Sequence, residues 1–321
     1  MNEQDILKEL ILKDYRYYKP WKEFLKWEGS YWDIIGYSGI YWEVIREFNK
    51  LNTSIKPSKL DKIFRDTINE LESDERFVVD SNSSIDNNKY ALNVINGLLI
   101  FNDKLEVIKF ISNEEKRGYY PIKCIHVNYN PSADCKKFKE WLGERVCNDL
   151  EEVKRALGSM LFNFKRNVII FWSHYEAGKT TLINILVKLL GADYITESDL
   201  SYYKYRGDTP YYRGQKVVEF LIFEYRKRQL KRLLSISDGI NILFEAWGPE
   251  ELTPIFYANT ITRPKVKKEM ECYIDNVYSI RFRKINNPII DYHKILLEER
   301  EGIFNFMLEG AREYADNNYK L

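Results

Sequence analysis

The sequence predicts an α/β protein with a helical N-terminal region, a core of parallel strands and helices, and a C-terminal helix. The first observation is a β-branched apolar run, Asn167–Trp172, which is typical of a buried parallel strand. The second is the segment behind it, where Gly178–Thr181 (Gly-Lys-Thr-Thr) opens a stretch with apolar residues at helical spacing. The third is a pair of apolar runs, at 216–226 and 254–260, which predict two more strands of the same sheet.

The N-terminal region, residues 1–80, has a helical pattern. Within 57–73, apolar positions recur every three or four residues and predict one buried helix face. Ser58 stands where an N-cap belongs, with Asp61 three residues on as an approximate capping box. Two aromatic-rich segments lie within 15–45, and their rings either stack on nucleic-acid bases or form the core of a small helical module.

Residues 85–130 predict a small sheet of three short strands, with turns at Asn96-Gly97 and Asn102-Asp103. A loop then leads into two predicted helices, near 135–147 and 149–164. The change of pattern predicts two domains. They are an accessory domain of helices and a small sheet, residues 1–130, and a domain with the phosphate-loop motif, residues 131–321.

The composition excludes several classes of protein. The 321 residues include 49 Lys and Arg against 48 Asp and Glu, a formal net charge of +1, so any contact with nucleic acid needs a local patch. Hydrophobic residues make up 45% of the chain, which favours a buried core over disorder. No run of about 18 apolar residues is present, and the first ten residues include four charged ones where a signal peptide would be apolar. We therefore expect a cytoplasmic protein without a membrane partner. The four cysteines and three histidines are dispersed, which does not favour a metal site built from them.

The motif that carries the chemistry is a strand, a loop, Gly-Lys-Thr and a helix, which is the arrangement of a phosphate-binding loop. Backbone N–H groups near Gly178 and the start of the following helix attract phosphate. Lys179 reaches the β- and γ-phosphates, and the Thr180 hydroxyl holds Mg²⁺. Ser173 stands where the motif has its first glycine, and serine tolerates a tight turn less well. We expect ATP and Mg²⁺ at a loop that comprises Ser173, Glu176, Ala177, Gly178, Lys179, Thr180 and Thr181.

Two strand ends are expected beside this loop. The run 216–226 ends at Glu224, a carboxylate that can complete the Mg²⁺ shell and orient or deprotonate the attacking water. Glu219 in the same run is the alternative acid, and an edge-strand carboxylate without a catalytic role also remains open. The next run ends at Asn259, which either ends the strand in a turn or is similar to the polar residue of additional-strand P-loop ATPases. In those enzymes that residue hydrogen-bonds the γ-phosphate and the attacking water.

The order of these motifs resembles a superfamily 3 helicase, most closely the helicase part of poxvirus-type and phage or plasmid primase-helicases. Two outlying segments are also similar to those proteins: 94–142, and 297–314 with its Gly302-Ile303-x-Asn305-Phe306 motif. The resemblance covers about residues 90–315. It implies an AAA+-like ATPase core in a homo-oligomeric ring, usually a hexamer, that moves along single- or double-stranded DNA. The residues that match the family's catalytic pattern are Lys179, Thr180, Glu224 and Asn259, with Thr180 and Glu224 on the metal side.

The resemblance also implies an arginine finger, which stabilises γ-phosphate charge in the neighbouring subunit. A further strand is predicted at 277–284, and the usual arginine is missing ahead of it, which leaves Arg281 and Arg283 as candidates. The family carries a DNA-contacting hairpin with a basic tip between Glu224 and Asn259. Here that region, 236–252, is acidic.

Positive charge concentrates in three clusters, at 226–232, 263–268 and 281–284. Residues 201–290 contain 16 Lys and Arg against 10 Asp and Glu, a net charge of +6 in a chain whose total is +1. Such charge near an ATPase strand end suits contact with a phosphate backbone in a ring channel. A solvated charged face or ion pairs between subunits would account for it equally.

Three functions remain open. The first is an ATP-dependent DNA helicase or translocase for replication of a viral or plasmid-type element. The second is an ATP-binding replication-initiation or loading factor of the same fold with weak or no hydrolysis, which Ser173, the single acid at Glu224 and the missing arginine favour. The third, a metabolic P-loop kinase, explains neither Asn259 nor the Gly302 segment. No acidic cluster of a primase is apparent, so we expect any primase activity on a separate polypeptide.

Overall fold

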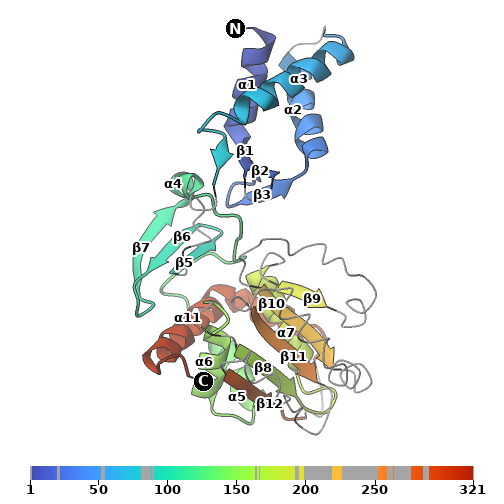
Figure 1. Ribbon diagram of the computed structural model, residues 1–321. Coiled ribbons are helices and arrows are strands. Elements are labelled where there is room, and N and C mark those ends of the chain that lie inside the picture. The colour runs from blue at the N-terminus through green and yellow to red at the C-terminus, as the bar shows by residue number, and fades with distance from the viewer. Residues whose placement is uncertain are drawn as a thin grey trace, which may run out of the picture. The chain divides into compact units, whose positions relative to one another are not determined.

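The structure is a computed structural model (Figure 1). It describes residues 2–19, 22–51, 55–80, 88, 90–162, 165, 167–191, 195–198, 219–225, 252–258, 263, 276–284 and 289–320, with the backbone alone at 195–198, 219–225 and 252–258. The chain divides into two compact units. The accessory unit comprises residues 1–88 and 112–123, and the core unit comprises residues 89–111 and 124–321.

The accessory unit combines three long helices with a four-stranded sheet of order β3-β2-β1-β4 (Figure 1). Its elements are α1 (Glu3–Asp14), β1 (Tyr15–Tyr18), β2 (Glu23–Trp27), β3 (Trp32–Ile35), α2 (Tyr37–Leu51), α3 (Pro57–Leu71), β4 (Val78–Val79), α4 (Asn113–Lys116) and a 3-10 helix (Arg117–Tyr119). The prediction of helix for residues 15–35 is therefore wrong. This stretch forms an antiparallel meander, in which Tyr17 pairs with Phe24 and Phe24 with Ile35, because aromatic and branched side chains pack well on a pleated surface.

The aromatic residues of this unit lie mainly in its core. Tyr15, Phe24 and Trp32 are buried, and the guanidinium groups of Arg16 and Arg117 lie 5.2 and 5.3 Å from the ring centre of Trp32. These positions decide in favour of the core-forming alternative for most of the aromatic segments. Tyr37 and Trp42 on α2 differ, because 44% and 68% of their surfaces are exposed.

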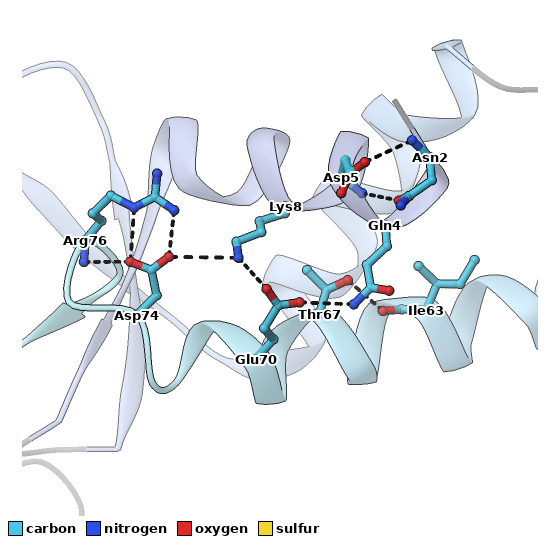
Figure 2. Close-up of polar contacts among 9 residues, drawn as sticks. All are labelled: Asn2, Gln4, Asp5, Lys8, Ile63, Thr67, Glu70, Asp74 and Arg76. Atoms are coloured by element: carbon cyan, nitrogen blue, oxygen red, sulfur yellow. Dashed lines mark hydrogen bonds and ion pairs between the residues drawn. The ribbon is translucent and has the colours of Figure 1, made fainter.

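A polar network links α1 to the end of α3 (Figure 2). Lys8 of α1 forms ion pairs with Glu70 and Asp74, and Gln4 donates a hydrogen bond to Glu70 over 3.2 Å. The predicted start of α3 needs correction: the helix begins at Pro57, with Lys56 as its N-cap, and Ser58 lies inside it. Proline is favoured at the first helical position because its missing N–H is one that the helix cannot pair.

The core unit contains a five-stranded parallel sheet of order β12-β8-β11-β10-β9 and a three-stranded sheet of order β5-β6-β7 (Figure 1). This confirms the α/β class and the three strands predicted within 85–130, while the AAA+-like assignment stays a prediction. The elements are β5 (Ala91–Val94), β6 (Gly97–Phe101), β7 (Val107–Ser112), α5 (Lys136–Arg145), α6 (Leu150–Gly158), β8 (Asn167–Trp172), α7 (Lys179–Leu190), β9 (Ile195–Ser198), β10 (Glu219–Tyr225), β11 (Leu252–Ala258), β12 (Asn276–Arg281), α10 (Tyr292–Leu296), a 3-10 helix (Leu297–Glu299) and α11 (Arg300–Asp316).

The structure divides the chain differently from the predicted boundary at residue 130. The small sheet at 91–111 belongs to the core unit, because Leu92, Val94 and Leu99 lie in the same buried cluster as the helices and strands that follow. Residues 112–123 return to the accessory unit, where the Trp32 indole donates a hydrogen bond to the carbonyl of Arg117. The chain thus crosses between the units more than once, which a linear reading of the sequence cannot show.

The C-terminal helix α11 contacts the loop that precedes α5. The side-chain amide of Asn305 donates to the carbonyls of Asn130 (2.7 Å) and Ala133 (2.9 Å). Gly302 lies so close to this loop that a Cβ atom there would be 2.2 Å from the carbonyl carbon and oxygen of Asp134. Glu299, in the turn before α11, accepts hydrogen bonds from the backbone N–H groups of Lys137 and Phe138 in the first turn of α5. The Gly302–Phe306 motif and Glu299 therefore connect the start of α11 to the start of α5.

No helix in the described part of the chain is long and apolar enough to cross a membrane.

Candidate nucleotide-binding loop

The candidate loop, residues 173–178, joins β8 to α7 at one edge of the parallel sheet. β8 lies between β12 and β11, and all three strands run in the same direction. The carboxyl ends of parallel strands meet at one edge, where open α/β sheets bind their ligands. The predicted strand at 167–172 and the predicted helix after Gly178 are both confirmed.

The backbone of the loop provides a place for an anion. Gly178 is the N-cap of α7 and has the left-handed conformation, with φ +94°. Glu176 is also left-handed (φ +59°), so a left-handed residue lies on each side of Ala177. Backbone turns of this kind before a helix form anion-binding concavities, and the helix start adds positive potential.

The space beside Gly178 is also limited. A Cβ atom there would lie 3.2 Å from Cζ2 of Trp141 and 3.7 Å from Cδ of Arg145. Both residues belong to α5, so this helix forms a wall beside the loop. These two residues are not among those predicted from the sequence. Their four-residue spacing on the predicted helix shows that they share a face, but not that this face meets the loop.

Lys179 is the first residue of α7, and only 2% of it is exposed. Its Nζ donates to Oγ of Ser173 (2.7 Å), to the carbonyl oxygen of Ser173 (3.2 Å) and to the carbonyl oxygen of His174 (2.7 Å). Burial lowers the pKa of Lys179 to about 8, because the interior disfavours the charged form. The loop therefore holds a buried cation at the helix start.

Ser173 is buried, and it is not among the residues with a left-handed backbone. The expectation that serine fits this place less well than glycine is therefore wrong for the backbone of this loop. Of the other predicted loop residues, Ala177 is buried, Thr181 is partly exposed, and Glu176 and Thr180 are exposed. Thr180 is the second residue of α7, in the first turn of the helix that follows the loop.

The backbone register aligns Glu224 with the loop. Glu224 of β10 pairs with Tyr257 of β11, and Tyr257 pairs with Phe171 of β8, two residues before the loop begins. Glu219 is the first residue of β10, at the opposite edge of the sheet, which removes it as the alternative acid. Asn259 lies outside the described residues, directly after Ala258, the residue that pairs with Trp172.

The two arginine candidates lie at and beyond the end of β12. Arg281 pairs with Trp172 in the ladder, and its guanidinium lies 5.1 Å from the centre of the Trp172 ring, a cation–π contact. The backbone N–H of Arg283 donates to the carbonyl of Arg145 over 2.7 Å. Arg281 therefore lies beside the loop of its own chain. Of the other basic clusters, 226–232 and 264–268 lie outside the described residues, as does most of the acidic segment 236–252.

The residues present fit a nucleotide triphosphate and its metal. The left-handed Gly178, the buried Lys179 ammonium and the start of α7 suit phosphate oxygens. The hydroxyl oxygen of Thr180 is a type of ligand that suits Mg²⁺. The backbone of Glu224 reaches the same edge of the sheet.

Comparison with known proteins gives two findings. Residues 4–147 match the family model described as "D5 N terminal like". The match relates this part of the chain, less than half of its length, to D5-like proteins. It ends after α5 and before β8, so the candidate loop lies outside it. A search of curated proteins gives no match.

Solved structures of the NrS-1 C-terminal region share the fold. An apo structure of its A form has a TM-score of 0.53 and 10% identity, and the match covers 97% of this chain and 72% of that chain. A second A-form apo structure has a TM-score of 0.52 and 10% identity, with 97% and 71% covered. A further apo structure has a TM-score of 0.50 and 9% identity, with 99% and 74% covered. Identities this low establish a shared fold and no shared activity.

Proposed function

We propose that this chain is an ATP-dependent DNA helicase or translocase, with a superfamily 3, AAA+-like P-loop core, acting in replication of a viral or plasmid-type element. The observation that carries the proposal is the buried Lys179 at the start of α7, behind the left-handed Gly178. The strand order adds support. β11, which leads to Asn259, lies between β8, which precedes the loop, and β10, which carries Glu224. An additional strand between these two strands is the feature after which the additional-strand P-loop ATPases are named.

Each residue has a defined role in this proposal. The backbone around Gly178 and the ammonium of Lys179 bind the β- and γ-phosphates, and Thr180 with Glu224 holds Mg²⁺. Bound Mg²⁺ supplies neutralisation of the phosphate charge. Glu224 orients or deprotonates the attacking water, which Asn259 also contacts. Arg281 adds positive charge at the edge of the loop.

The assembly is part of the same proposal. The chain forms a homo-oligomeric ring, taken to be a hexamer, with DNA in a channel lined by the basic clusters between residues 226 and 284. Arg283 is exposed and directly follows the buried Phe282. In this ring it is the candidate for the arginine finger that reaches the nucleotide of a neighbouring subunit. We place this activity in the cytoplasm.

The test compares Lys179→Ala with Lys188→Ala, an exposed lysine of the same helix. ATP hydrolysis is measured with and without single-stranded DNA, beside a mass measurement of the assembly. Lys179→Ala should reduce turnover by about 100-fold or more, the usual cost of removing a group that stabilises transition-state charge. Lys188→Ala should match the wild type. Undiminished hydrolysis by Lys179→Ala would refute the site.

The second candidate is an ATP-binding loading factor with weak or no hydrolysis. It is favoured by the missing arginine ahead of β12 and by the cation–π contact that holds Arg281 against Trp172 of its own chain. ATP binding by the wild type without turnover, in the presence of DNA and Mg²⁺, would support this candidate over the motor.

A further inference from the structure

The side chain of Ser173 is bound directly to Lys179. Oγ of Ser173 accepts a hydrogen bond from Nζ of Lys179 over 2.7 Å, and both residues are buried, with 4% and 2% of their surface exposed. Two backbone carbonyls, those of Ser173 and His174, accept from the same ammonium. Of these three oxygens, the hydroxyl is the one that a mutation can remove without changing the backbone.

The hydroxyl can meet Lys179 only as an acceptor. It donates its own proton to the carbonyl of His174 over 2.7 Å, so its lone pairs remain for the ammonium. A lysine ammonium has three N–H donors, and the three oxygens at residues 173 and 174 can occupy all of them. A phosphate oxygen must therefore displace at least one of these oxygens before Lys179 can bind it.

We propose that Ser173 is a positioning residue that holds Lys179 inside the loop until a phosphate replaces the hydroxyl, and that it thereby lowers the affinity for nucleotides. The inference rests on the proposed nucleotide function of the loop. A glycine at this place, as in the usual motif, has no side-chain oxygen to displace. Ser173 is not left-handed, so its effect comes from the hydroxyl and not from the backbone.

The experiment uses the full chain and measures the binding of ATP, ADP and AMP without Mg²⁺, so that hydrolysis does not intervene. The variants are Ser173→Ala, which removes the hydroxyl, and Ser173→Thr, which keeps one. Ser173→Ala should bind ATP and ADP about tenfold more tightly, the size of one hydrogen bond to a charged group. AMP affinity should stay unchanged, because AMP lacks the β- and γ-phosphates that Lys179 contacts. Ser173→Thr should restore the wild-type affinities.

A second readout uses the protein without nucleotide. Loss of a partner for the buried ammonium should lower the melting temperature of Ser173→Ala, while Ser173→Thr keeps it. If Ser173 had a merely structural role, its substitution by alanine would lower both the melting temperature and the affinity for ATP. The proposal instead predicts that the melting temperature falls while the affinity for ATP rises.

The outcomes separate this inference from the proposed function. If the wild type binds ATP and Ser173→Ala binds it with the same or lower affinity, the role of Ser173 is overturned and the proposed function is not. Equal tightening for AMP also overturns it, because a general loosening of the loop would then be the cause. ATP binding by Ser173→Gly but not by the wild type supports it. Absence of ATP binding in the wild type, Ser173→Ala and Ser173→Gly overturns the inference and the proposed function together.

Discussion

The contact between Gly302 and the loop before α5 gives a sharp test of how α11 holds the core unit together. In Gly302→Ala, the new Cβ would lie 2.2 Å from both the carbonyl carbon and oxygen of Asp134, and 2.7 Å from the backbone nitrogen of Cys135. All three are backbone atoms, so no side chain can rotate away. The loop has to move by about 1 Å, and overpacking of this kind typically costs about 1–3 kcal/mol.

Two effects of opposite sign determine the result. Alanine gains about 1 kcal/mol over glycine inside a helix. Against an overpacking cost of about 3 kcal/mol, the upper end of the range because every contact is with backbone, the net destabilisation is about 2 kcal/mol. For a unit of roughly 200 residues this lowers the melting temperature by about 4–8 °C.

The matched control is Gly143→Ala. Gly143 is an exposed glycine of α5, and a Cβ there meets nothing within 4 Å. This variant shows the helix-propensity gain alone and should raise the melting temperature by about 2–4 °C. Differential scanning calorimetry of the full chain measures both variants. If Gly302→Ala is as stable as Gly143→Ala, α11 does not approach the loop as closely as described.

Two further predictions concern other polar contacts. Hydrogen bonds from Arg76 lower the pKa of Asp74 from 3.8 to about 2, so Asp74 contributes stability that is complete above pH 3.8 and is lost as the pH falls through 2. The gap in urea unfolding free energy between the wild type and Asp74→Asn should therefore narrow between pH 4 and pH 2, and a gap that stays constant would contradict the pairing drawn in Figure 2. Asn305→Ala removes two hydrogen bonds to the carbonyls of Asn130 and Ala133 and should cost about 1–2 kcal/mol in chemical denaturation. Asn305→Asp should be no more stable than Asn305→Ala, because a carboxylate cannot donate to a carbonyl, and full stability in Asn305→Asp would count against these bonds.

Short-range patterns predicted the part of the site that is local in sequence. The strand 167–172, the loop and the helix after Gly178 follow one another along the chain, and each has a recognisable residue pattern. The wall formed by Trp141 and Arg145 could not be predicted, because it depends on packing between residues that are more than thirty positions apart. The alignment of Glu224 with the end of β8 depends on the strand order, which the residue pattern does not contain.

The errors in the accessory unit have a related cause. Residues 15–35 contain aromatic residues and interspersed lysines, a composition compatible with either an amphipathic helix or short strands. The strand conformation is stabilised by the pairing of β1 with β2 and with β4, and β4 lies some sixty residues further along the chain. The start of α3 was misplaced for a local reason: Pro57 at the first helical position outweighs Ser58 as a starting signal.

The departure of Ser173 from the usual motif bears directly on the choice between a motor and a loading factor. A serine there would argue against a nucleotide loop if the backbone required glycine, but Ser173 is not left-handed and its side chain is buried within the loop. What changes is the surroundings of Lys179, which gains a hydroxyl oxygen that any phosphate must displace. On the proposal above, such a change alters the affinity for nucleotides and leaves Glu224 and Asn259, the residues proposed to act on water, unchanged. Ser173 therefore indicates weaker nucleotide binding and not a loss of hydrolysis, so it does not favour the loading factor. Turnover measured at saturating ATP decides between the two functions.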